Sequence, residues 1–539
     1  MLRTATLLAV LILQAVSPPA SALYDVKAHG ATGDGATSDT AAIQAAMDAC
    51  TQAGGGTVYF PPGAYLTGSL HLRSRVTLWL DNGATLLGSE SKEDYDRYEE
   101  LGFENDADGE TTYFHFALLW GEDVEHIAIM GQGTIDSNRF GRGGPKAIAL
   151  KRCRHVSIRD ITIQNIPNYA ISLLGTDYVN IDGVTILRGF ADGIDPDASR
   201  NVRISNCHIE TVDDAIVPKA SFSLGERRST ENITVTNCYL ATECSGFKLG
   251  TESGGDFKRI AVSNCIVTAL PERRPPRGGI CIESVDGANI DGVVVNNISM
   301  IDVRMPVFVR LGNRGRDMET SVPGSLRNVI VSNITATGAS LACSIAGVPG
   351  HAIEGVTLSN LRVEYRGGAS YLPEAEMPEQ EADYPDPEMY DYQPVYALYA
   401  RHVRDLVLTD VDFTYRDNYW RIATTDNRKV RWHTEAGIPD PSEAGNTGPA
   451  AAFDDVARLR INGFAAQPPA NYPMLRFINV RDAQLRGCAA ETGAGVFLEV
   501  QGSESNRIVL TDSQLEGVAA VKAAADVPSD AVQLLPNAN

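Results

Sequence analysis

Past its first 22 residues the chain lacks an apolar run long enough to cross a bilayer as a helix, which takes about 18 residues or more. Basic residues are also scarce, because 46 Lys and Arg stand against 68 Asp and Glu and leave a formal net charge of −22. Nucleic acids and anionic membranes are bound through basic surfaces that neutralise their phosphates. We therefore expect no nucleic acid and no membrane among the partners, and interpret the acidic charge mainly as a source of solubility.

The nine cysteines do not fit a disulfide framework. An odd number cannot pair completely, and Cys207, Cys238 and Cys265 occupy the same place in successive repeats of the sequence. A small apolar side chain at a recurring position suits an inward-facing ladder. We therefore expect stacked free thiols in a core.

The N-terminus is typical of an export signal. Arg3 precedes an apolar run from Ala5 to Val16, and Ala20-Ser21-Ala22 offers an A-x-A cleavage site. This pattern predicts a signal peptide over residues 1–22, a mature chain that begins at Leu23, and a secreted or periplasmic location.

Alternating apolar residues recur along the chain in units such as NVRISNCHI, NITVTNCYL and RIAVSNCIV. Ten units align, with steps that vary from 23 to 50 residues, and a constant strand with variable connectors is typical of a solenoid of stacked coils. We therefore expect one domain over residues 23–539. The units start at Ile127, Val156, Val179, Val202, Ile233, Ile260, Val293, Val329, Val356 and Leu406.

Asparagine lies four residues after the start of six units. Asn tolerates left-handed backbone and can hydrogen-bond along a stack, so we expect a structural ladder at a tight turn, inward or within the stack. The six residues are Asn206, Asn237, Asn264, Asn297, Asn333 and Asn360.

Asp192, Asp213 and Asp214 lie in adjacent units at nearly the spacing of one coil. Asp213 follows Asp192 by 21 residues where the unit step is 23, and Ser245 follows Asp214 by 31 where the step is 31. Hydrogen-bonded strands are about 5 Å apart, so we expect these residues and Lys248 on one surface. Clustered carboxylates raise one another's proton affinity, which suits acid catalysis. The alternative is that they cap turns or bind an ion.

These motifs resemble the pectin-hydrolysing polygalacturonases of glycoside hydrolase family 28. The resemblance rests on GDG and GGGTVYFPPGAY near the N-terminus, ADGID at 191–195, VDDAI at 212–216 and CSGFKLGTES at 244–253. It covers the chain roughly from Tyr24 to Tyr415, and implies an all-β, right-handed parallel β-helix that hydrolyses glycosidic bonds with inversion. By the same resemblance Asp213 is the acid, and Asp192 and Asp214 activate water.

Two parts of the family pattern are changed. The family's histidine is matched by Ser245, and the Arg-Ile-Lys that binds a galacturonate carboxylate is matched by Cys281-Ile282-Glu283. Because a bound carboxylate needs a paired cation, we expect an enzyme other than an ordinary endo-polygalacturonase, acting on chain ends or side-branch sugars of a pectin-like glycan. The predicted substrate-binding residues are Ser245, Lys248, Glu252 and Glu283, with Lys219 orienting a carboxylate.

The expected partner is a polysaccharide or oligosaccharide substrate, with no cofactor and no metal, and a monomer is expected. A helix with Ile43, Ala46, Met47 and Cys50 on one face, and Ser38 or Asp39 as its N-cap, would cover the open end of the stack. Insertions near 91–116, 366–394 and 415–450 are predicted to be sugar-stacking walls or solvated linkers.

Three other functions stay open on the sequence alone. A β-elimination lyase of the same architecture would need a basic residue near the scissile uronate, for which Lys219 and Lys248 are the candidates. A noncatalytic carbohydrate-binding β-helix would explain the lost histidine. A purely structural solenoid would bind no glycan.

Overall fold

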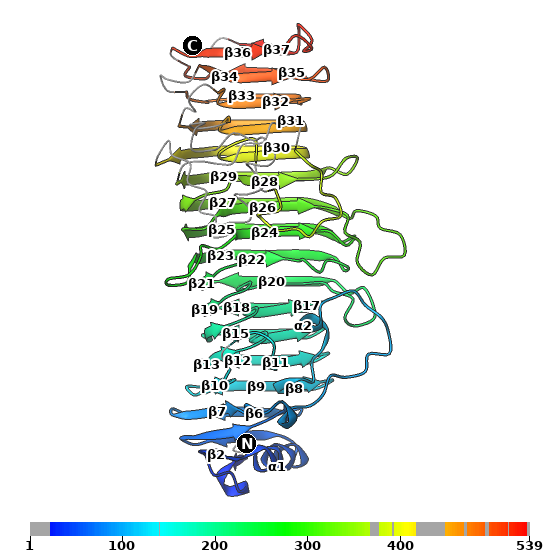
Figure 1. Cartoon of the computed structure of the whole chain (residues 1–539), viewed down its shortest axis with the longest axis vertical. Helices are drawn as coiled ribbons and strands as arrows, with labels where there is room; N and C mark the ends of the chain where they lie inside the picture. The colour runs from blue at the N-terminus through cyan, green and yellow to red at the C-terminus, as the bar shows by residue number, and fades with distance from the viewer. Residues whose placement is uncertain are drawn as a thin grey trace, which may run out of the picture.

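The computed structural model describes residues 22–139, 141–366, 377–390, 393–416, 448–467, 472–490, 495–515 and 517–535. The chain forms a long stack of coils, with the N-terminal strands and α1 at one end and β36 and β37 at the other (Figure 1). All strand pairings within the described residues are parallel, apart from one isolated antiparallel bridge between Val348 and His351. Parallel strands joined by crossovers coil right-handedly, so the prediction of a right-handed parallel β-helix is confirmed.

Three parallel sheets form the walls of the coil. The first, here called the floor sheet, contains β5 (Leu70–His71), β8 (Ala117–Glu122), β11 (Lys146–Lys151), β14 (Ile171–Leu174), β17 (Ile194–Asp197), β22 (Ser245–Leu249), β24 (Gly278–Ser284), β26 (Met305–Leu311), β28 (Cys343–Ala346), β32 (Leu475–Ile478), β34 (Val496–Gln501) and β36 (Ala519–Ala523).

The second sheet follows the floor sheet along each coil. It contains β1 (Leu23–Asp25), β3 (Gly56–Phe60), β6 (Val76–Leu80), β9 (Glu125–Gly131), β12 (Arg154–Arg159), β15 (Asp177–Asp182), β18 (Arg200–Ser205), β20 (Thr230–Thr236), β33 (Arg481–Arg486), β35 (Asn506–Thr511) and β37 (Val532–Leu534).

The third sheet closes the coil. It contains β2 (Asp34–Ser38), β4 (Gly63–Thr67), β7 (Ala84–Gly88), β10 (Thr134–Asp136), β13 (Thr162–Ile166), β16 (Thr185–Gly189), β19 (His208–Thr211) and β21 (Tyr239–Thr242). Longer strands continue from the second sheet into the third, namely β23 (Phe257–Ala269), β25 (Asn289–Ile301), β27 (Ser325–Ala339) and β29 (Ile353–Tyr365), while β30 (Leu398–Tyr415) and β31 (Ala451–Ala466) also begin in the floor sheet.

The register of the second sheet confirms the repeat alignment. Val156 pairs with Ile127 on one side and with Val179 on the other, and each later start residue pairs with the next as far as Leu406. A slip of one residue would turn every apolar side chain from the core to solvent, so the alternation itself fixes this register.

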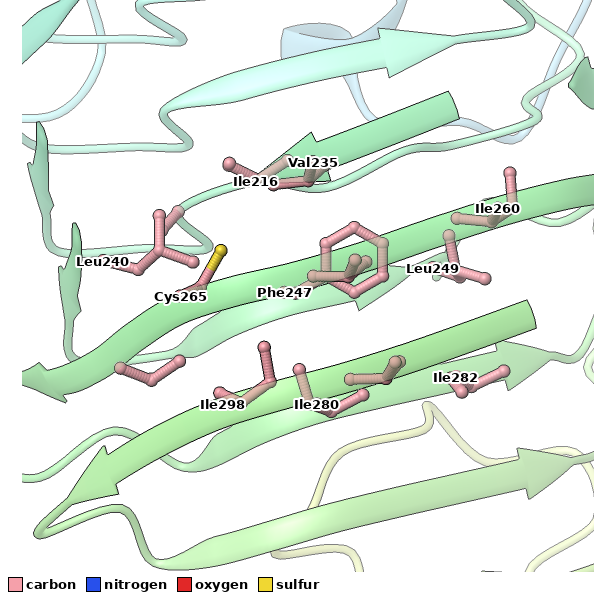
Figure 2. Close-up of a cluster of buried hydrophobic side chains, with 14 of the residues drawn as sticks. Ile216, Val235, Leu240, Phe247, Leu249, Ile260, Cys265, Ile280, Ile282 and Ile298 are labelled. Atoms are coloured by element: carbon pink, nitrogen blue, oxygen red, sulfur yellow. The ribbon is translucent and has the colours of Figure 1, made fainter. Parts of the chain in front are cut away.

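Apolar side chains from the three sheets fill the interior of the coil. Figure 2 shows part of this interior, where Ile216, Phe247 and Ile280 of three successive coils lie one after another within the apolar cluster. Each fully buried Val, Ile or Leu stabilises the fold by about 1.5–3 kcal/mol relative to an exposed side chain.

The cysteine ladder is a predicted part of this core. Cys207, Cys238 and Cys265 are buried and free, as expected, and each thiol donates to the carbonyl oxygen two residues before it at 3.2–3.3 Å.

The asparagine ladder forms at the turn between the second and third sheets. The amide of Asn237 donates to Asn206, that of Asn297 to Asn264 and that of Asn360 to Asn333, at 3.3, 2.8 and 2.7 Å. All six residues have φ between 50° and 58°, the left-handed region that Asn tolerates. The predicted stack is therefore present, but its side chains are exposed and do not face inward.

The expected capping helix is α1 (Thr40–Gln52), which lies at the N-terminal end of the stack against β1, β3 and β5 (Figure 1). Its buried residues are Ile43, Ala46, Met47 and Cys50, the face predicted from spacing. Asp39 occupies the N-cap position without capping the helix, because its carboxylate accepts from the backbone N–H groups of Thr32 and Gly33 at 2.6 and 3.0 Å.

Two of the three predicted insertions can be placed. The first contains η2 (Lys92–Asp94) and α2 (Gly109–Thr112), and crosses the floor sheet to reach Tyr169, whose hydroxyl lies 3.1 Å from Thr111 Oγ1. Residues 377–390 of the second cross the floor sheet further along, where Met389 packs against Cys281, Met305 and Phe308. The third insertion and the predicted signal peptide lie almost wholly outside the described residues. A further short helix, η1 (Lys27–His29), precedes β2.

Candidate active site

Asp192, Asp214 and Ser245 lie one above the next, two residues before the aligned floor-sheet positions of three successive coils. The backbone N–H of Asp214 donates to Asp192 Oδ1 at 3.2 Å, and that of Ser245 donates to Asp214 Oδ1 at 2.9 Å. The coil pairing Ile194–Ile216–Phe247 holds this alignment. The carboxylates therefore stack along the axis as the coil spacing predicts.

A buried lysine joins Asp192 to a second carboxylate. Lys219 Nζ lies 2.8 Å from Asp192 Oδ2 and 2.8 Å from Asp195 Oδ1, and it donates to the Tyr169 hydroxyl at 2.9 Å. All three charged side chains are at most 6% exposed. Burial raises the pKa of both aspartates, although Lys219 opposes the effect, and the two carboxylates in turn raise the pKa of Lys219 against the effect of burial.

A second buried lysine lies between Asp214 and Glu283. Lys248 Nζ is 3.2 Å from Asp214 Oδ2 and 3.9 Å from Glu283 Oε2. Glu283 is completely buried, and neither of its carboxyl oxygens has a hydrogen-bond partner among the described residues. Burial raises the pKa of Glu283 to about 8, which leaves this carboxyl mostly protonated at neutral pH.

The third cation is Arg142, from the loop between β10 and β11. Its Nη1 donates to Asp213 Oδ2 at 2.5 Å, while Nε donates to Glu110 Oε1 of α2 at 3.0 Å and Nη2 also contacts that carboxylate. Asp213 is about a quarter exposed, unlike Asp192 and Asp214, which are buried. Burial by itself would raise the pKa of Asp213, but Arg142, together with Lys248 and Cys244, outweighs it and the pKa is lowered.

The cluster thus contains three similar ion-pair bridges, because each of Lys219, Lys248 and Arg142 lies between two carboxylates. Six ionised carboxylates would exceed these three cations by three charges. Uncompensated charge is costly in a buried site, so the cluster retains protons, as the raised pKa values of Asp192, Asp195 and Glu283 indicate.

By distance alone, part of this cluster could bind a metal ion. One carboxylate oxygen each from Asp213 and Asp214 and the sulfur of Cys244 lie within 4.8 Å of one another. Arg142 and Lys248 already contact these two carboxylates, however, so the group offers no open ligand set.

The structure also places three other predicted substrate-binding residues. Glu283 and the Ser245 side chain are buried beneath the floor surface, and Ser245 Oγ lies 3.6 Å from Cys281 Sγ. Glu252 accepts from Arg316 Nη1 at 3.3 Å and lines a separate, shallow open pocket with Ser221, Phe222 and Asp286.

Sequence reasoning missed Arg142, Glu110 and two aromatic residues at the cluster, Tyr169 and Tyr384. Tyr384, from the second insertion, is 50% exposed, and the Lys248 ammonium lies 5.5 Å from its ring centroid. Arg142 lies on a Gly-Arg-Gly turn and Glu110 in the first insertion, so neither has a repeat position that could point to it.

The two insertions flank the exposed Asp213. On one side Glu110 and Thr111 of α2 contact Arg142 and Tyr169. On the other side residues 377–390 are held by ion pairs, among them Arg277 with Asp386 at 2.6 Å. Asp213 is therefore the member of the aspartate trio that a ligand can reach between them.

A model of glycosyl hydrolases family 28 matches residues 104–380, just over half of the chain and the whole of this cluster. The chain belongs to glycoside hydrolase family 28. It is accordingly a glycoside hydrolase of the polygalacturonase-like type, as the motifs predict.

Individual family 28 relatives are distant. The chain is 24% identical over 371 residues to a probable polygalacturonase of Vitis vinifera, covering 64% of this chain and 74% of the relative. It is 25% identical over 398 residues to an exo-poly-alpha-D-galacturonosidase of Dickeya chrysanthemi, covering 60% of this chain and 64% of the relative, slightly less than two thirds of that protein's length.

Solved structures show the same fold. A hyperthermoactive exopolygalacturonase from Thermotoga maritima superposes with a TM-score of 0.59 at 20% identity, covering 73% of this chain and 92% of its own. The family 28 exopolygalacturonase of Yersinia enterocolitica gives a TM-score of 0.59 at 20% identity and covers 74% of this chain and 77% of its own. None of the helices in the described residues is long and apolar enough to cross a membrane.

Proposed function

We propose that this hydrolase removes neutral or deoxy sugars from chain ends or side branches of a pectin-like glycan by a single inverting displacement. Asp213 protonates the leaving oxygen, and Asp192 with Asp214 activates the attacking water. The observation that carries the proposal is the cluster of three aspartates, each with its own cation, in which Asp213 alone is partly exposed.

The division of roles follows from burial. An inverting hydrolase needs an acid at the leaving oxygen and a base on the opposite face of the sugar ring. Asp213 can reach a bound glycan, whereas the backbone N–H of Asp214 and the ammonium of Lys219 fix the carboxylate of Asp192 in place. Burial makes Asp192 a strong proton acceptor once it is ionised, because its pKa is raised.

The charge of the site supports a neutral sugar. Cys281 and Glu283 stand where the family binds a galacturonate carboxylate, and neither is a cation. Lys248, which could replace the missing cation, is already engaged by Asp214 and Glu283. A galacturonate carboxylate would enter a cluster with surplus negative charge, and its burial there without a free cation is costly.

The same pairing argues against a lyase. Abstraction of a proton next to a uronate needs a base that is free to accept it. Lys219 and Lys248 both have a raised pKa because each lies between carboxylates, so both stay protonated at neutral pH.

Attack at chain ends is supported by the two insertions. The first reaches the cluster through Glu110 and Thr111, and the second through Tyr384 and Asp386. Endo action requires an open groove, and such a groove would have to pass both insertions. The export signal predicted over residues 1–22 suits an enzyme that meets polysaccharide outside the cytoplasm, and N-terminal sequencing of the mature protein tests the expected start at Leu23.

The function is tested by digesting unbranched polygalacturonate beside branched rhamnogalacturonan, with products sized over time. We expect small neutral sugars to be released from the branched polymer without a rapid fall in its chain length. Rapid internal cutting of polygalacturonate would contradict the substrate proposal. Ultraviolet absorbance of an unsaturated product would reveal a lyase, and binding without new reducing ends would reveal a noncatalytic protein.

A further inference from the structure

Arg142 differs from the other two cations of the cluster in its exposure. Its side chain is 48% exposed, compared with 5% for Lys219 and 6% for Lys248. Gly141 and Gly143 flank it with φ of 151° and 101°, and no atom would lie within 4 Å of a Cβ at either glycine. The guanidinium therefore lies on a turn with open space around its backbone.

The contacts of Arg142 are unequal. One nitrogen, Nη1, donates to Asp213, whereas both Nε and Nη2 donate to Glu110. Two-nitrogen contact between a guanidinium and a carboxylate is the stronger arrangement. Arg142 can therefore leave Asp213 and keep a complete ion pair with Glu110.

The contact with Asp213 conflicts with the role of an acid. A carboxyl group that protonates a leaving oxygen must first hold a proton, and a guanidinium against it favours the ionised form. The charged and titratable groups around Asp213 are Arg142, Lys248 and Arg277 on the cationic side, and Asp192, Asp214, Glu110 and the thiol of Cys244 on the other. Arg142 is the cation in direct contact, so its departure leaves Asp213 facing mainly carboxylates.

We propose that Arg142 gates the acid, because a sugar that binds at Asp213 moves its guanidinium off that carboxylate and onto Glu110 alone. The inference rests on the proposed role of Asp213. Asp213 then takes a proton from solvent and passes it to the leaving oxygen, while the Asp192–Asp214 pair takes a proton from the attacking water. Arg142 is thus a positioning residue that makes protonation of Asp213 depend on bound substrate.

The gate predicts that loss of Arg142 changes the pH dependence of kcat/KM but not that of kcat. The pH profile of kcat/KM reports the free enzyme, and that of kcat reports the complex. In Arg142→Met the basic limb of kcat/KM should move to higher pH, with about a two- to fivefold gain on that limb, the scale of a partly exposed ion pair. The basic limb of kcat should stay where it is in the wild type, because there Arg142 has already left Asp213.

Two more variants sharpen the test. Glu110→Gln removes the second partner of Arg142, so the basic limbs of both profiles should move to lower pH. Arg152→Met is the matched control, because Arg152 is 45% exposed and also lies between two carboxylates, Glu122 and Asp123. Arg152→Met should show the same basic limbs of kcat and kcat/KM as the wild type.

Initial rates on rhamnogalacturonan oligosaccharides and on polygalacturonate provide the profiles. The gate is contradicted if the pH profiles of Arg142→Met differ from the wild type only in height. It is also contradicted if the basic limbs of kcat and kcat/KM shift by the same amount. If Asp213→Asn stays active, or neither polymer is cleaved, the proposed function fails and the gate with it. If Asp213→Asn is inactive and the Arg142→Met limbs do not move, the gate alone fails.

The ion pair between Arg142 and Asp213 in the free enzyme can be tested without substrate. A carboxyl whose pKa is lowered by folding contributes stability above its unfolded pKa, and that stability is lost as the pH falls through the folded pKa. The difference in Tm between wild type and Arg142→Met should therefore shrink in acid. A difference that is the same in acid as at neutral pH would show that Arg142 does not act through Asp213.

Discussion

Replacement of Lys219 by Met tests the buried bridge with the shorter ion-pair distances. Lys219 compensates Asp192 and Asp195 at 2.8 Å each, and these side chains are 5%, 6% and 2% exposed, so solvent screens them little. Removal of one partner from a buried ion pair typically costs about 3–5 kcal/mol, because the remaining charge is left without compensation. We expect a loss of this size in the free energy of unfolding at neutral pH, together with a loss of activity.

The pH dependence of this loss has a definite sign. Burial raises the pKa values of Asp192 and Asp195, and Lys219 opposes this effect. Without Lys219 both pKa values therefore rise further. A carboxyl with a raised folded pKa contributes stability at low pH that is lost as the pH rises. The gap between wild type and Lys219→Met should therefore be widest at basic pH and narrow toward acid, where the two aspartates are protonated.

Urea-induced unfolding followed by circular dichroism at several pH values measures the gap. Lys258→Met is the control, because Lys258 is 37% exposed and pairs only with Asp256 at 2.9 Å among the described residues, so it should cost at most about 1 kcal/mol. A Lys219→Met loss as small as that of the control, or one that does not change with pH, would refute the argument that Lys219 compensates both carboxylates.

Two further substitutions test the buried carboxyl of Glu283 and the half-exposed ring of Tyr384. Because the pKa of Glu283 is raised from 4.5 to about 8, wild-type stability should fall as the pH rises through that range, and Glu283→Gln should be more stable than wild type above it by about 2–5 kcal/mol, with equal stability near pH 4. Equal urea midpoints above pH 8 would count against a buried, titrating Glu283. Tyr384→Ala removes a half-exposed aromatic face beside Lys248, so KM on the cleaved glycan should rise several-fold while kcat changes little; an unchanged KM would remove Tyr384 from the substrate path.

The fold could be predicted because its information is local and periodic. Alternation with period two places Val202, Ile233 and Ile260 inside, and only one register keeps all of them there. The burial of Ile43 and Met47 follows in the same way from helical spacing. The asparagine ladder forms within the stack, one of the two placements expected, and its side chains are exposed because the turn between two sheets lies outside the apolar alternation.

The site was partly predictable for the same reason. Asp192, Asp213 and Asp214 lie on repeat coils, so the coil spacing is enough to bring them together. Arg142 and Glu110 lie in a turn and an insertion, and Tyr384 near Lys248 comes from residues 377–390, far along the chain from the aspartates. Contacts made by non-repeating loops leave no periodic signal in the sequence.

The proposed mechanism depends on Asp213 as the acid of this family 28 hydrolase. The most direct test is the turnover of Asp213→Asn on the cleaved glycan, measured beside the wild type with circular dichroism and Tm recorded on the same samples. We predict a loss of about 10²–10⁴ in kcat, because the amide cannot donate the proton that the leaving oxygen needs, with the β-helix intact. Wild-type turnover by a folded Asp213→Asn protein would contradict the account.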